Sequence, residues 1–316
     1  MIERLKSFKK VSYITLIVLF LLVGLGGLVR VTESGMGCPD WPKCFGLWVP
    51  PTCECQLPDN YHEIYKDHGY PIGSNFDVVK TWIEYFNRLA GVLTGLFVML
   101  TLYLAYRVRS IHRYIFYGSL LCFILVILEG GLGAMVVKLN LQKESVTIHY
   151  LMAIVLIACL LFAIAAMRRV EINDTFLLDK KQRNYLIAAI AITSLQLMSG
   201  VNLRGITEAI TDISTFEWLQ RNEPIFTMHR IYSFLVLLGC YKVWIHFRNY
   251  HFSKIALLAM WSSLVVQIIT GILLNYFNFP KIAQTIHILM PAILFCSQFY
   301  ILSFIIIKKE AIEVSI

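Results

Sequence analysis

The sequence contains two closely similar stretches, Val146–Ala153 (VTIHYLMA) and Gln284–Pro291 (QTIHILMP). Each stretch opens a long apolar segment, and each places a histidine, His149 or His287, near the start of that segment. A histidine inside a membrane span is energetically costly, so its presence asks for a functional reason. Two histidines at corresponding positions of two halves of one chain indicate a duplicated site.

The composition outside these stretches is that of a membrane protein. The chain has 316 residues, of which 58% are apolar and only 15% charged, whereas soluble domains carry about 25% charged residues. Apolar runs near the roughly 20 residues that cross a bilayer predict an all-α integral membrane protein with eight transmembrane helices. The first run is long and lacks a small-residue cleavage site, so we do not expect a cleaved signal peptide. The predicted spans are 11–29, 81–106, 114–137, 147–167, 185–203, 224–246, 255–275 and 282–306.

The basic residues predict the orientation of these spans. If the N-terminus lies inside, the inner segments hold more lysine and arginine than the outer ones, as cytoplasmic segments do. We therefore expect both termini to be cytoplasmic, in a multi-pass protein of the plasma membrane. The net charge of +8 follows from this bias. It predicts attraction to anionic lipid of the bilayer and gives no reason to expect a nucleic-acid partner.

The repeat extends beyond the two histidine stretches. His149 and His287 are 138 positions apart, and Asn87-Arg88 corresponds to His229-Arg230 at an offset of 142. Each half holds an even number of spans, so we predict two pseudo-symmetric four-helix bundles related by an axis along the membrane normal. The N-terminal half covers 1–167 with a large outer loop at 30–80, a cytoplasmic linker covers 168–184, and the C-terminal half covers 185–316.

Two smaller features of the repeat concern the third and seventh spans. The sequence aligns the pair Gly130-Gly131 with Gly271, where small residues let helices approach closely. Glu129, which precedes the glycine pair, is an acid inside an apolar run and is expected to have no counterpart in the second half.

The histidines of the second half predict a heme site. His229 and His287 come from two different spans of one bundle, and this arrangement supplies axial nitrogens on the two faces of a heme iron. The alternative is that both are core histidines bonded to neighbouring carbonyls. Zinc is less favoured, because the ligand set is poor in histidine and has no fixed cysteine or carboxylate partner within the half.

The first half departs from this pattern. Asn87 stands where the second half has His229, and an amide is a very weak iron ligand, so His149 is expected to be the only protein ligand there. Glu84 lies one turn before Asn87 on the same helical face. One histidine, one open iron face and one nearby acid describe a reactive site, whereas two histidines describe an electron-transfer site. The alternative for Glu84 is an ion pair with Arg88, and both roles are compatible.

Two arginines directly follow the expected ligand positions. Arg88 and Arg230 are candidates to pair with heme propionates at the outer edge of the bundles. The alternative is that both side chains extend toward the lipid headgroups.

Four cysteines lie in the outer loop, on the oxidising side of the membrane, where a disulfide is expected. They permit three pairings. We expect Cys53 and Cys55 to be too close in sequence to bridge each other comfortably, which favours a Cys38–Cys44 bridge or a cross pairing.

Several stretches together resemble one known family. The stretches Gly26–Gly35 (GGLVRVTESG) and Cys38–Cys44 (CPDWPKC) closely resemble the first outer loop of heme A synthases. The segment Glu84–Gly91, the two Thr-Ile-His starts and Met228–Arg230 match the same family, and the resemblance keeps motif order over nearly the whole chain.

This resemblance implies an eight-helix membrane oxidase of the cytochrome oxidase assembly pathway. It implies oxidation of the C8 methyl group of heme O to the formyl group of heme A by successive hydroxylations. A heme b is implied at His229 and His287, and the substrate heme O at Asn87 and His149. Glu84 is implied as an important acid, and Cys38 with Cys44 as a disulfide. The family usually has histidine at the position of Asn87, so this chain departs from it there.

The expected partners are heme O, a heme O synthase, an electron donor in the membrane and a second copy of the chain in a homo-oligomer. Two other functions remain open. In the first, the chain is a membrane cytochrome b that only transfers electrons. In the second, it is a degenerate heme-binding paralogue, and Asn87 favours both alternatives. A transporter is disfavoured, because the sequence shows no pair of interrupted spans near mid-membrane.

Overall fold

The computed structural model describes residues 2–67, 75–172, 179–207, 223–277 and 279–307. Over these residues the fold is all-helical and contains no β-strand. The long helices of the described residues are α1 (Ile2–Val31), α3 (Val78–Arg107), α4 (Arg113–Lys138), α5 (Lys143–Glu171), α6 (Lys180–Thr207), α8 (Glu223–Phe247), α9 (Lys254–Tyr276) and α10 (Lys281–Ile306). Two short helices, η1 (Glu54–Gln56) and α2 (Tyr61–Asp67), lie in the segment between α1 and α3, and a third, η2 (His251–Ser253), packs on α9 and α10.

Each predicted span falls within one of these helices, and the largest difference is at the start of α1. That helix begins at Ile2 rather than near residue 11. Its first turns are polar, and they are tied down by an ion pair between Lys9 and Glu171 of α5, at 2.9 Å. A helix can extend beyond its apolar run, because polar residues form the same backbone hydrogen bonds in turns that lie in water.

Among the described residues, seven helices are long and apolar enough to cross a membrane: all the long helices except α8. The chain is thus a multi-pass helical membrane protein. Helix α8 has 25 residues but carries polar side chains near both ends, including His229, Arg230, Lys242 and His246. An eighth crossing by α8 therefore remains a prediction.

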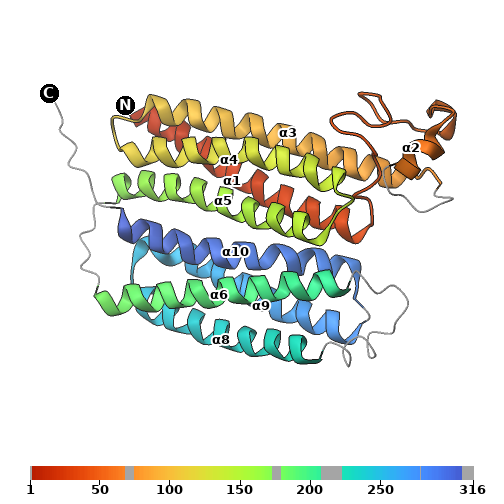
Figure 1. Cartoon of the computed structure of the whole chain (residues 1–316). Helices are drawn as coiled ribbons and strands as arrows, with labels where there is room; N and C mark the ends of the chain where they lie inside the picture. The colour runs from red at the N-terminus through yellow and green to blue at the C-terminus, as the bar shows by residue number, and fades with distance from the viewer. Residues whose placement is uncertain (1, 68–74, 173–178, 208–222, 278, 308–316) are drawn as a thin grey trace.

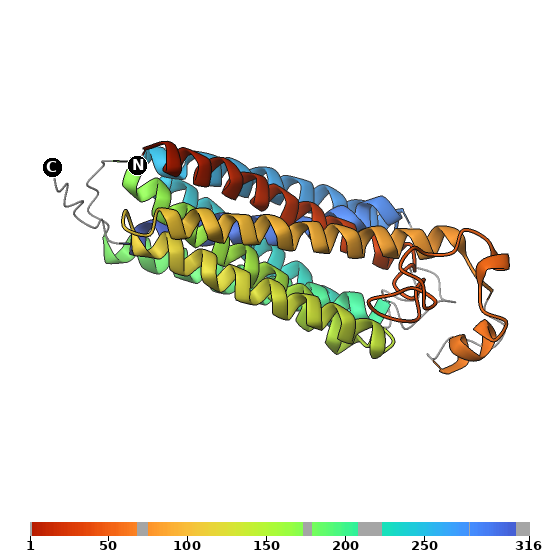
Figure 2. The same ribbon diagram turned by 90° about the horizontal axis from the view of Figure 1, so that it is seen from above.

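The long helices pack as two neighbouring groups. In one group α1 packs on α3 and α5, and α4 packs on both α3 and α5; in the other, α6 packs on α8 and α10, and α9 on α10. The groups meet where α10 contacts α1 and α5, and Figures 1 and 2 show all of these helices running side by side along one axis. Helix α5 is the most buried of the seven apolar helices, while α4 turns most of its surface outward.

The ends of the bundle differ in what they carry. The described start of α1 and the described end of α10 lie at the same end (Figure 1). The segment between α1 and α3, including α2, projects beyond the opposite end in both views (Figures 1 and 2). The outer loop is thus separated from the described ends of the chain by the full length of the helices.

Helices α5 and α10 contact each other at corresponding positions of the repeat. The Tyr150 hydroxyl donates to the carbonyl of Ile288 at 2.8 Å, and the two residues are 138 positions apart. The Arg169 Nε group donates to the carbonyl of Ile307 at 3.4 Å, again across 138 positions. Contacts between equivalent residues are what a two-fold axis between two similar halves produces.

Candidate functional site

The second group of helices brings two predicted site residues together. His229 of α8 and His287 of α10 have ring centres 6.5 Å apart, with their planes inclined at 52°. A metal between two imidazoles needs about 2 Å to each nitrogen, and about 1 Å more to each ring centre, which gives about 6 Å in total. The separation of the two rings therefore fits a shared iron.

Neighbouring side chains orient the His287 ring. Its Nδ1 lies 2.9 Å from the hydroxyl of Thr270, and that hydroxyl donates to the carbonyl of Val266 at 2.8 Å. Because the hydroxyl proton is used in this way, the Thr270 oxygen accepts the Nδ1 proton, and Nε2 keeps its lone pair. Fixing one ring nitrogen by a hydrogen bond is how proteins present the other nitrogen to a metal.

Both Nε2 atoms of the pair have an amide beside them. The Nε2 of Gln196 on α6 lies 3.3 Å from Nε2 of His229, and the Nε2 of Gln267 on α9 lies 3.3 Å from Nε2 of His287. Gln196 also donates to the hydroxyl of Ser233 at 2.6 Å. Two neutral imidazoles with lone pairs and adjacent amides form a donor set suited to a heme iron.

Each of the three predicted histidine ligands lies against a glycine of a neighbouring helix. A Cβ atom at Gly200 would lie 3.2 Å from Cε1 of His229, and one at Gly271 would lie 3.4 Å from Cε1 of His287. In the first group, a Cβ at Gly133 would lie 3.5 Å from Cε1 of His149. Glycine therefore lets a helix backbone approach the face of each ring.

The first group contains a histidine–carboxylate contact that the sequence did not predict. His149 of α5 has its Nδ1 3.1 Å from Oε1 of Glu129 on α4. The two atoms approach without the alignment of a full hydrogen bond, and no other described residue bonds to either. The amide oxygen of Asn87 on α3 is also buried without a hydrogen-bond partner among the described residues.

These contacts correct two expectations about the repeat. Glu129 does have a counterpart, because Gln267 stands 138 positions later and also contacts the neighbouring histidine. Gly271 corresponds at the same offset to Gly133 rather than to Gly130-Gly131, and nothing lies within 4 Å of a Cβ built on either of those two glycines. The offset of 138 between the histidines gives the right alignment of α4 with α9, whereas matching Gly130-Gly131 to Gly271 gives a wrong one.

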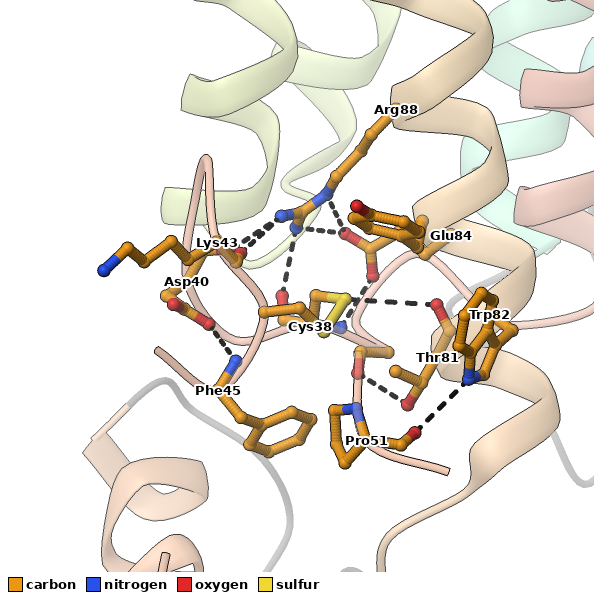
Figure 3. Close-up of a disulfide and its surroundings, with 12 residues drawn as sticks. Cys38, Asp40, Lys43, Phe45, Pro51, Thr81, Trp82, Glu84 and Arg88 are labelled. Atoms are coloured by element: carbon orange, nitrogen blue, oxygen red, sulfur yellow. Dashed lines mark hydrogen bonds and ion pairs between the residues drawn. A yellow bond between two sulfur atoms is a disulfide. The ribbon is translucent and has the colours of Figure 1, made fainter. Parts of the chain in front are cut away.

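Glu84 lies at the boundary between α3 and the outer loop. One carboxylate oxygen, Oε2, accepts the backbone N–H of Cys38 at 2.9 Å. The other, Oε1, accepts from Nε and Nη2 of Arg88 at 3.1 and 2.5 Å. Only 4% of the Glu84 side chain is exposed. The ion pair that the sequence left open as an alternative is thus present, and Figure 3 shows Glu84 between the arginine and the loop.

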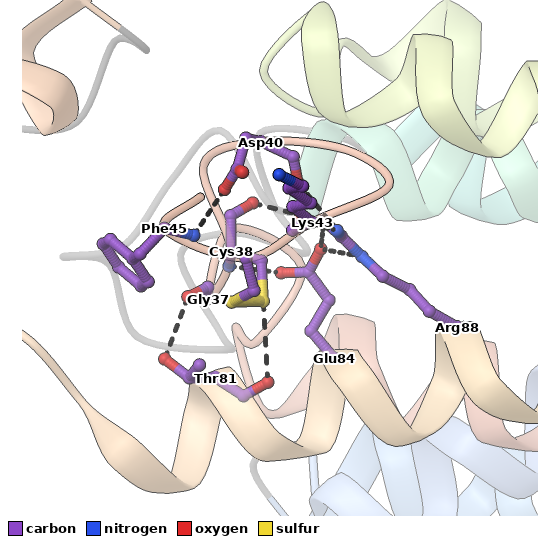
Figure 4. Close-up of polar contacts among 9 residues, drawn as sticks. Gly37, Cys38, Asp40, Lys43, Phe45, Thr81, Glu84 and Arg88 are labelled. Carbon is purple, nitrogen blue, oxygen red and sulfur yellow. Dashed lines mark hydrogen bonds and ion pairs between the residues drawn. A yellow bond between two sulfur atoms is a disulfide. The ribbon is translucent and has the colours of Figure 1, made fainter. Parts of the chain in front are cut away.

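Arg88 joins α3 to the outer loop through three carbonyl groups. Its Nη1 donates to the carbonyls of Asp40 and Lys43 at 2.7 and 2.9 Å, and its Nη2 donates to the carbonyl of Cys38 at 3.3 Å. Figure 4 shows the guanidinium reaching across Glu84 to this loop. Its donors are therefore occupied by protein. Arg230, in contrast, is exposed and has its guanidinium carbon 4.6 Å from the centre of the Phe226 ring.

The loop residues around Gly37 sit directly on α3. Thr81 donates its hydroxyl proton to the carbonyl of Gly37 at 2.9 Å. A Cβ atom at Gly37 would lie 2.6 Å from the carbonyl oxygen of Lys80, so only glycine fits there. Asp40 accepts the backbone N–H groups of Phe45 and Gly46 at 2.5 and 2.9 Å, which fixes the turn that follows.

The four outer-loop cysteines pair locally in this structure. The sulfur atoms of Cys38 and Cys44 are 2.09 Å apart, and those of Cys53 and Cys55 are 1.96 Å apart. The structure thus pairs Cys53 with Cys55, a pairing that the sequence disfavoured. Extended backbone at Cys53 (φ −148°, ψ 159°) separates their Cα atoms by 5.3 Å, within the usual range for a disulfide.

The polar side chains inside the two groups of helices indicate what kind of metal group they could hold. Within the described part of the chain, no group of three or more His, Cys, Asp or Glu side chains is arranged to hold a metal ion alone. Several buried polar atoms without a hydrogen-bond partner among the described residues instead belong to histidines or to side chains that contact a histidine. These side chains are His149, His229, Glu129, Gln196 and Gln267. Imidazole pairs with unsatisfied polar neighbours fit a large polar-edged group whose own nitrogens complete the metal coordination.

These features define a multi-pass helical membrane protein whose two groups of helices carry histidines in contact with neighbouring helices. Comparison with known proteins then gives the family. Residues 9–299 match a family model described as cytochrome oxidase assembly protein, and the chain belongs to this family. With that membership it is an enzyme of the membrane oxidoreductase type.

Relatives similar to this chain carry the name heme A synthase. One from Ehrlichia ruminantium (strain Gardel) is 24% identical and covers 91% of this chain and 90% of its own length. One from Orientia tsutsugamushi (strain Boryong) is 22% identical and covers 95% of this chain and 96% of its own length. One from Geobacillus kaustophilus (strain HTA426) is 27% identical over 61% of this chain and 54% of its own length.

Proposed function

We propose that this chain is a heme A synthase, which oxidises the C8 methyl group of heme O to a formyl group. Two successive hydroxylations convert the methyl group to a hydrated aldehyde, and loss of water leaves the formyl group. Family membership and the relatives named heme A synthase support a role in heme A biosynthesis. The observation that carries the proposal is the pair of imidazoles with ring centres 6.5 Å apart.

His229 and His287 hold the resident heme b in this proposal. A bound heme supplies one-electron chemistry, and the protein contributes its position and electronic surroundings. Thr270 fixes the ring of His287, and the amides of Gln196 and Gln267 lie beside the two ligand nitrogens. Two histidine ligands would suit this heme to passing electrons.

The substrate heme O binds between α3 and α5 in this proposal. His149 is its protein ligand, and Asn87 leaves the opposite face of the iron without a strong ligand. Glu84, Arg88 and the Cys38–Cys44 bridge hold the outer loop over the end of this bundle, where they keep water and lipid headgroups out. Glu84 is then the acid that orders a proton path beside the substrate, and Arg230 is the arginine with an exposed guanidinium for a propionate.

The membrane arrangement follows from the same proposal. Helix α8 forms the eighth crossing, because α8 packs on α6 along the second bundle. The bundles are pseudo-symmetric halves spanning 1–167 and 185–316, both termini are cytoplasmic, and the membrane is the plasma membrane. Heme O, delivered by a heme O synthase, a membrane electron donor and a second copy of the chain are the expected partners.

Expression in a host that makes heme O but no heme A tests the activity. The pigments extracted from the membranes should contain heme A and its hydroxylated precursor. His149→Ala should abolish both pigments, while His251→Ala, at an exposed residue of η2, should leave them unchanged. Folded, heme-loaded protein without either pigment would contradict the proposal.

That negative result would favour the second candidate, a cytochrome b that only transfers electrons. The observation in its favour is Asn87, which stands where the second half has His229 and where the family usually has histidine. It predicts that heme b alone is extracted from the purified chain.

A further inference from the structure

His149 and His287 contact different side chains in the two halves. At an offset of 138, Glu129 of α4 corresponds to Gln267 of α9, and Leu132 corresponds to Thr270. In the second half the Nδ1 atom of His287 meets the Thr270 hydroxyl at 2.9 Å. Leucine has no hydroxyl, and in the first half the Nδ1 atom of His149 instead meets the Glu129 carboxylate at 3.1 Å.

Among the described residues, the Glu129 carboxylate contacts no polar partner other than His149. Both of its oxygens are buried, and neither bonds to another described residue. Its side chain is 13% exposed, and within the described ranges no lysine or arginine forms an ion pair with it. A buried carboxylate is destabilising unless a partner compensates it. The His149 imidazole is the partner that the structure supplies.

Within the proposed function, we propose that Glu129 is the positioning residue of the substrate-heme site. Its carboxylate accepts the Nδ1 proton of His149, fixes the ring and leaves Nε2 as the nitrogen that faces the iron. A carboxylate behind a metal-bound histidine makes that histidine a stronger electron donor than a hydroxyl does. His149 is therefore a stronger donor than His287, whose Nδ1 contacts only the Thr270 hydroxyl.

This difference assigns different chemistry to the two halves. A more electron-rich histidine would favour the ferric over the ferrous form of a porphyrin iron bound there. Asn87 leaves the other face of that iron open. The neutral partners Thr270 and Gln267 suit the half that transfers electrons. Three differences between the halves thus separate a reactive half from a relay half: Glu129 against Gln267, Leu132 against Thr270, and Asn87 against His229.

Glu129→Gln is the direct test, because it keeps the shape of the side chain and copies the residue of the second half. The probe is ferric protoporphyrin IX bound to the full-length chain in detergent. The first site, with one histidine, gives high-spin bands, whereas the second gives low-spin bands, so the two are read separately. Glu129→Gln should weaken binding at the first site about 10- to 100-fold. Its reduction should become about tenfold more favourable, a rise of about 59 mV in midpoint potential.

Spectroscopy separates electronic tuning from a merely structural effect. The iron–histidine stretching frequency of the reduced first-site heme should fall in Glu129→Gln and recover partly in Glu129→Asp, which keeps the carboxylate. Glu144→Gln is the matched control, because it removes an exposed acid from the first turn of α5. It should change neither the frequency nor the potential.

Placing the first-half residues in the second half should change the potential in the opposite direction. Gln267→Glu combined with Thr270→Leu gives the second half the two residues of the first. The midpoint potential of the low-spin heme should then fall by a similar amount. An unchanged potential in this double variant would overturn the assignment of donor strength to these positions.

Different results would contradict the role of Glu129 and the proposed substrate site. If wild type binds a high-spin porphyrin and Glu129→Gln leaves its potential and stretching frequency unchanged, the role of Glu129 is wrong and the function stands. If no porphyrin binds in the first half of wild type, the substrate site itself is wrong and the inference falls with it. Nitrogen-15 labelling of histidine in the porphyrin-free chain adds an independent result: His149 should carry its proton on Nδ1 in wild type and lose this preference in Glu129→Gln.

Discussion

The Tyr150 hydroxyl donates a hydrogen bond of 2.8 Å to the carbonyl of Ile288, its counterpart 138 positions later in the chain. The bond joins α5 to α10, the two helices that carry His149 and His287. The same contact therefore ties the two proposed heme sites together through the centre of the molecule. It also lies one residue from each histidine, so it fixes the relative depth of the two ligands.

Tyr150→Phe should destabilise the interface between the two groups of helices. It removes one buried hydrogen bond, worth about 1 kcal/mol. The thermal unfolding midpoint in detergent should fall by a few degrees at most. Tyr117→Phe, at an exposed tyrosine of α4, is the control and should leave the midpoint unchanged. Equal midpoints for all three proteins would show that the bond does not stabilise the interface.

Gly37→Ala should detach the outer loop from α3. The new Cβ would lie 2.6 Å from the carbonyl oxygen of Lys80, a backbone atom that has no free rotation to move away. The bonds from Thr81 and to Glu84 would then be lost with it. Limited proteolysis from the outer side should cut the loop of the variant faster. Gly26→Ala, where nothing lies within 4 Å, should behave as wild type.

Glu84→Gln should weaken both the fold and the activity. It breaks a buried ion pair with Arg88, and removing one partner of such a pair costs about 3–5 kcal/mol. Denaturant unfolding and pigment extraction from one preparation measure the two effects together. Glu33→Gln, which removes the exposed partner of Lys80, should change stability by less than about 1 kcal/mol. A stable Glu84→Gln protein with full heme A production would argue against both roles of this residue.

Asn87→His should add a second axial ligand to the heme of the first half. The spectrum of that heme should shift from high spin to low spin, because histidine is a strong iron ligand and an amide is not. Asn87→Gln, which keeps the amide, should stay high spin. If heme occupies the site and Asn87→His leaves the spectrum unchanged, Asn87 does not lie near the iron.

The long apolar runs were enough to predict the long helices, since each predicted span falls inside one of them. It did not predict the start of α1, because polar turns extend a helix as well as apolar ones do. It also did not single out α8, the one long helix of the described residues that is not among the candidate membrane spans. The eight crossings and the pseudo-symmetry of the halves stay predictions that the packing of α5 on α10 supports.

The candidate site was predictable where residues repeat and unpredictable where folding joins distant segments. The places of His229 and His287 on two different spans of one half predicted this pair, which the structure brings together. The contact between Glu129 and His149 joins two helices across 20 positions, and only the same offset, applied to Gln267, would have revealed it. The use of Arg88 on loop carbonyls depends on where the loop folds, and the sequence carried no signal for it.

The central claim is that one heme iron lies between the imidazoles of His229 and His287. Electron paramagnetic resonance of the purified, oxidised chain measures this most directly. We predict a low-spin ferric signal typical of two imidazole ligands that disappears in His229→Ala and in His287→Ala and persists in His149→Ala. A low-spin signal that survives both second-half substitutions would contradict the claim.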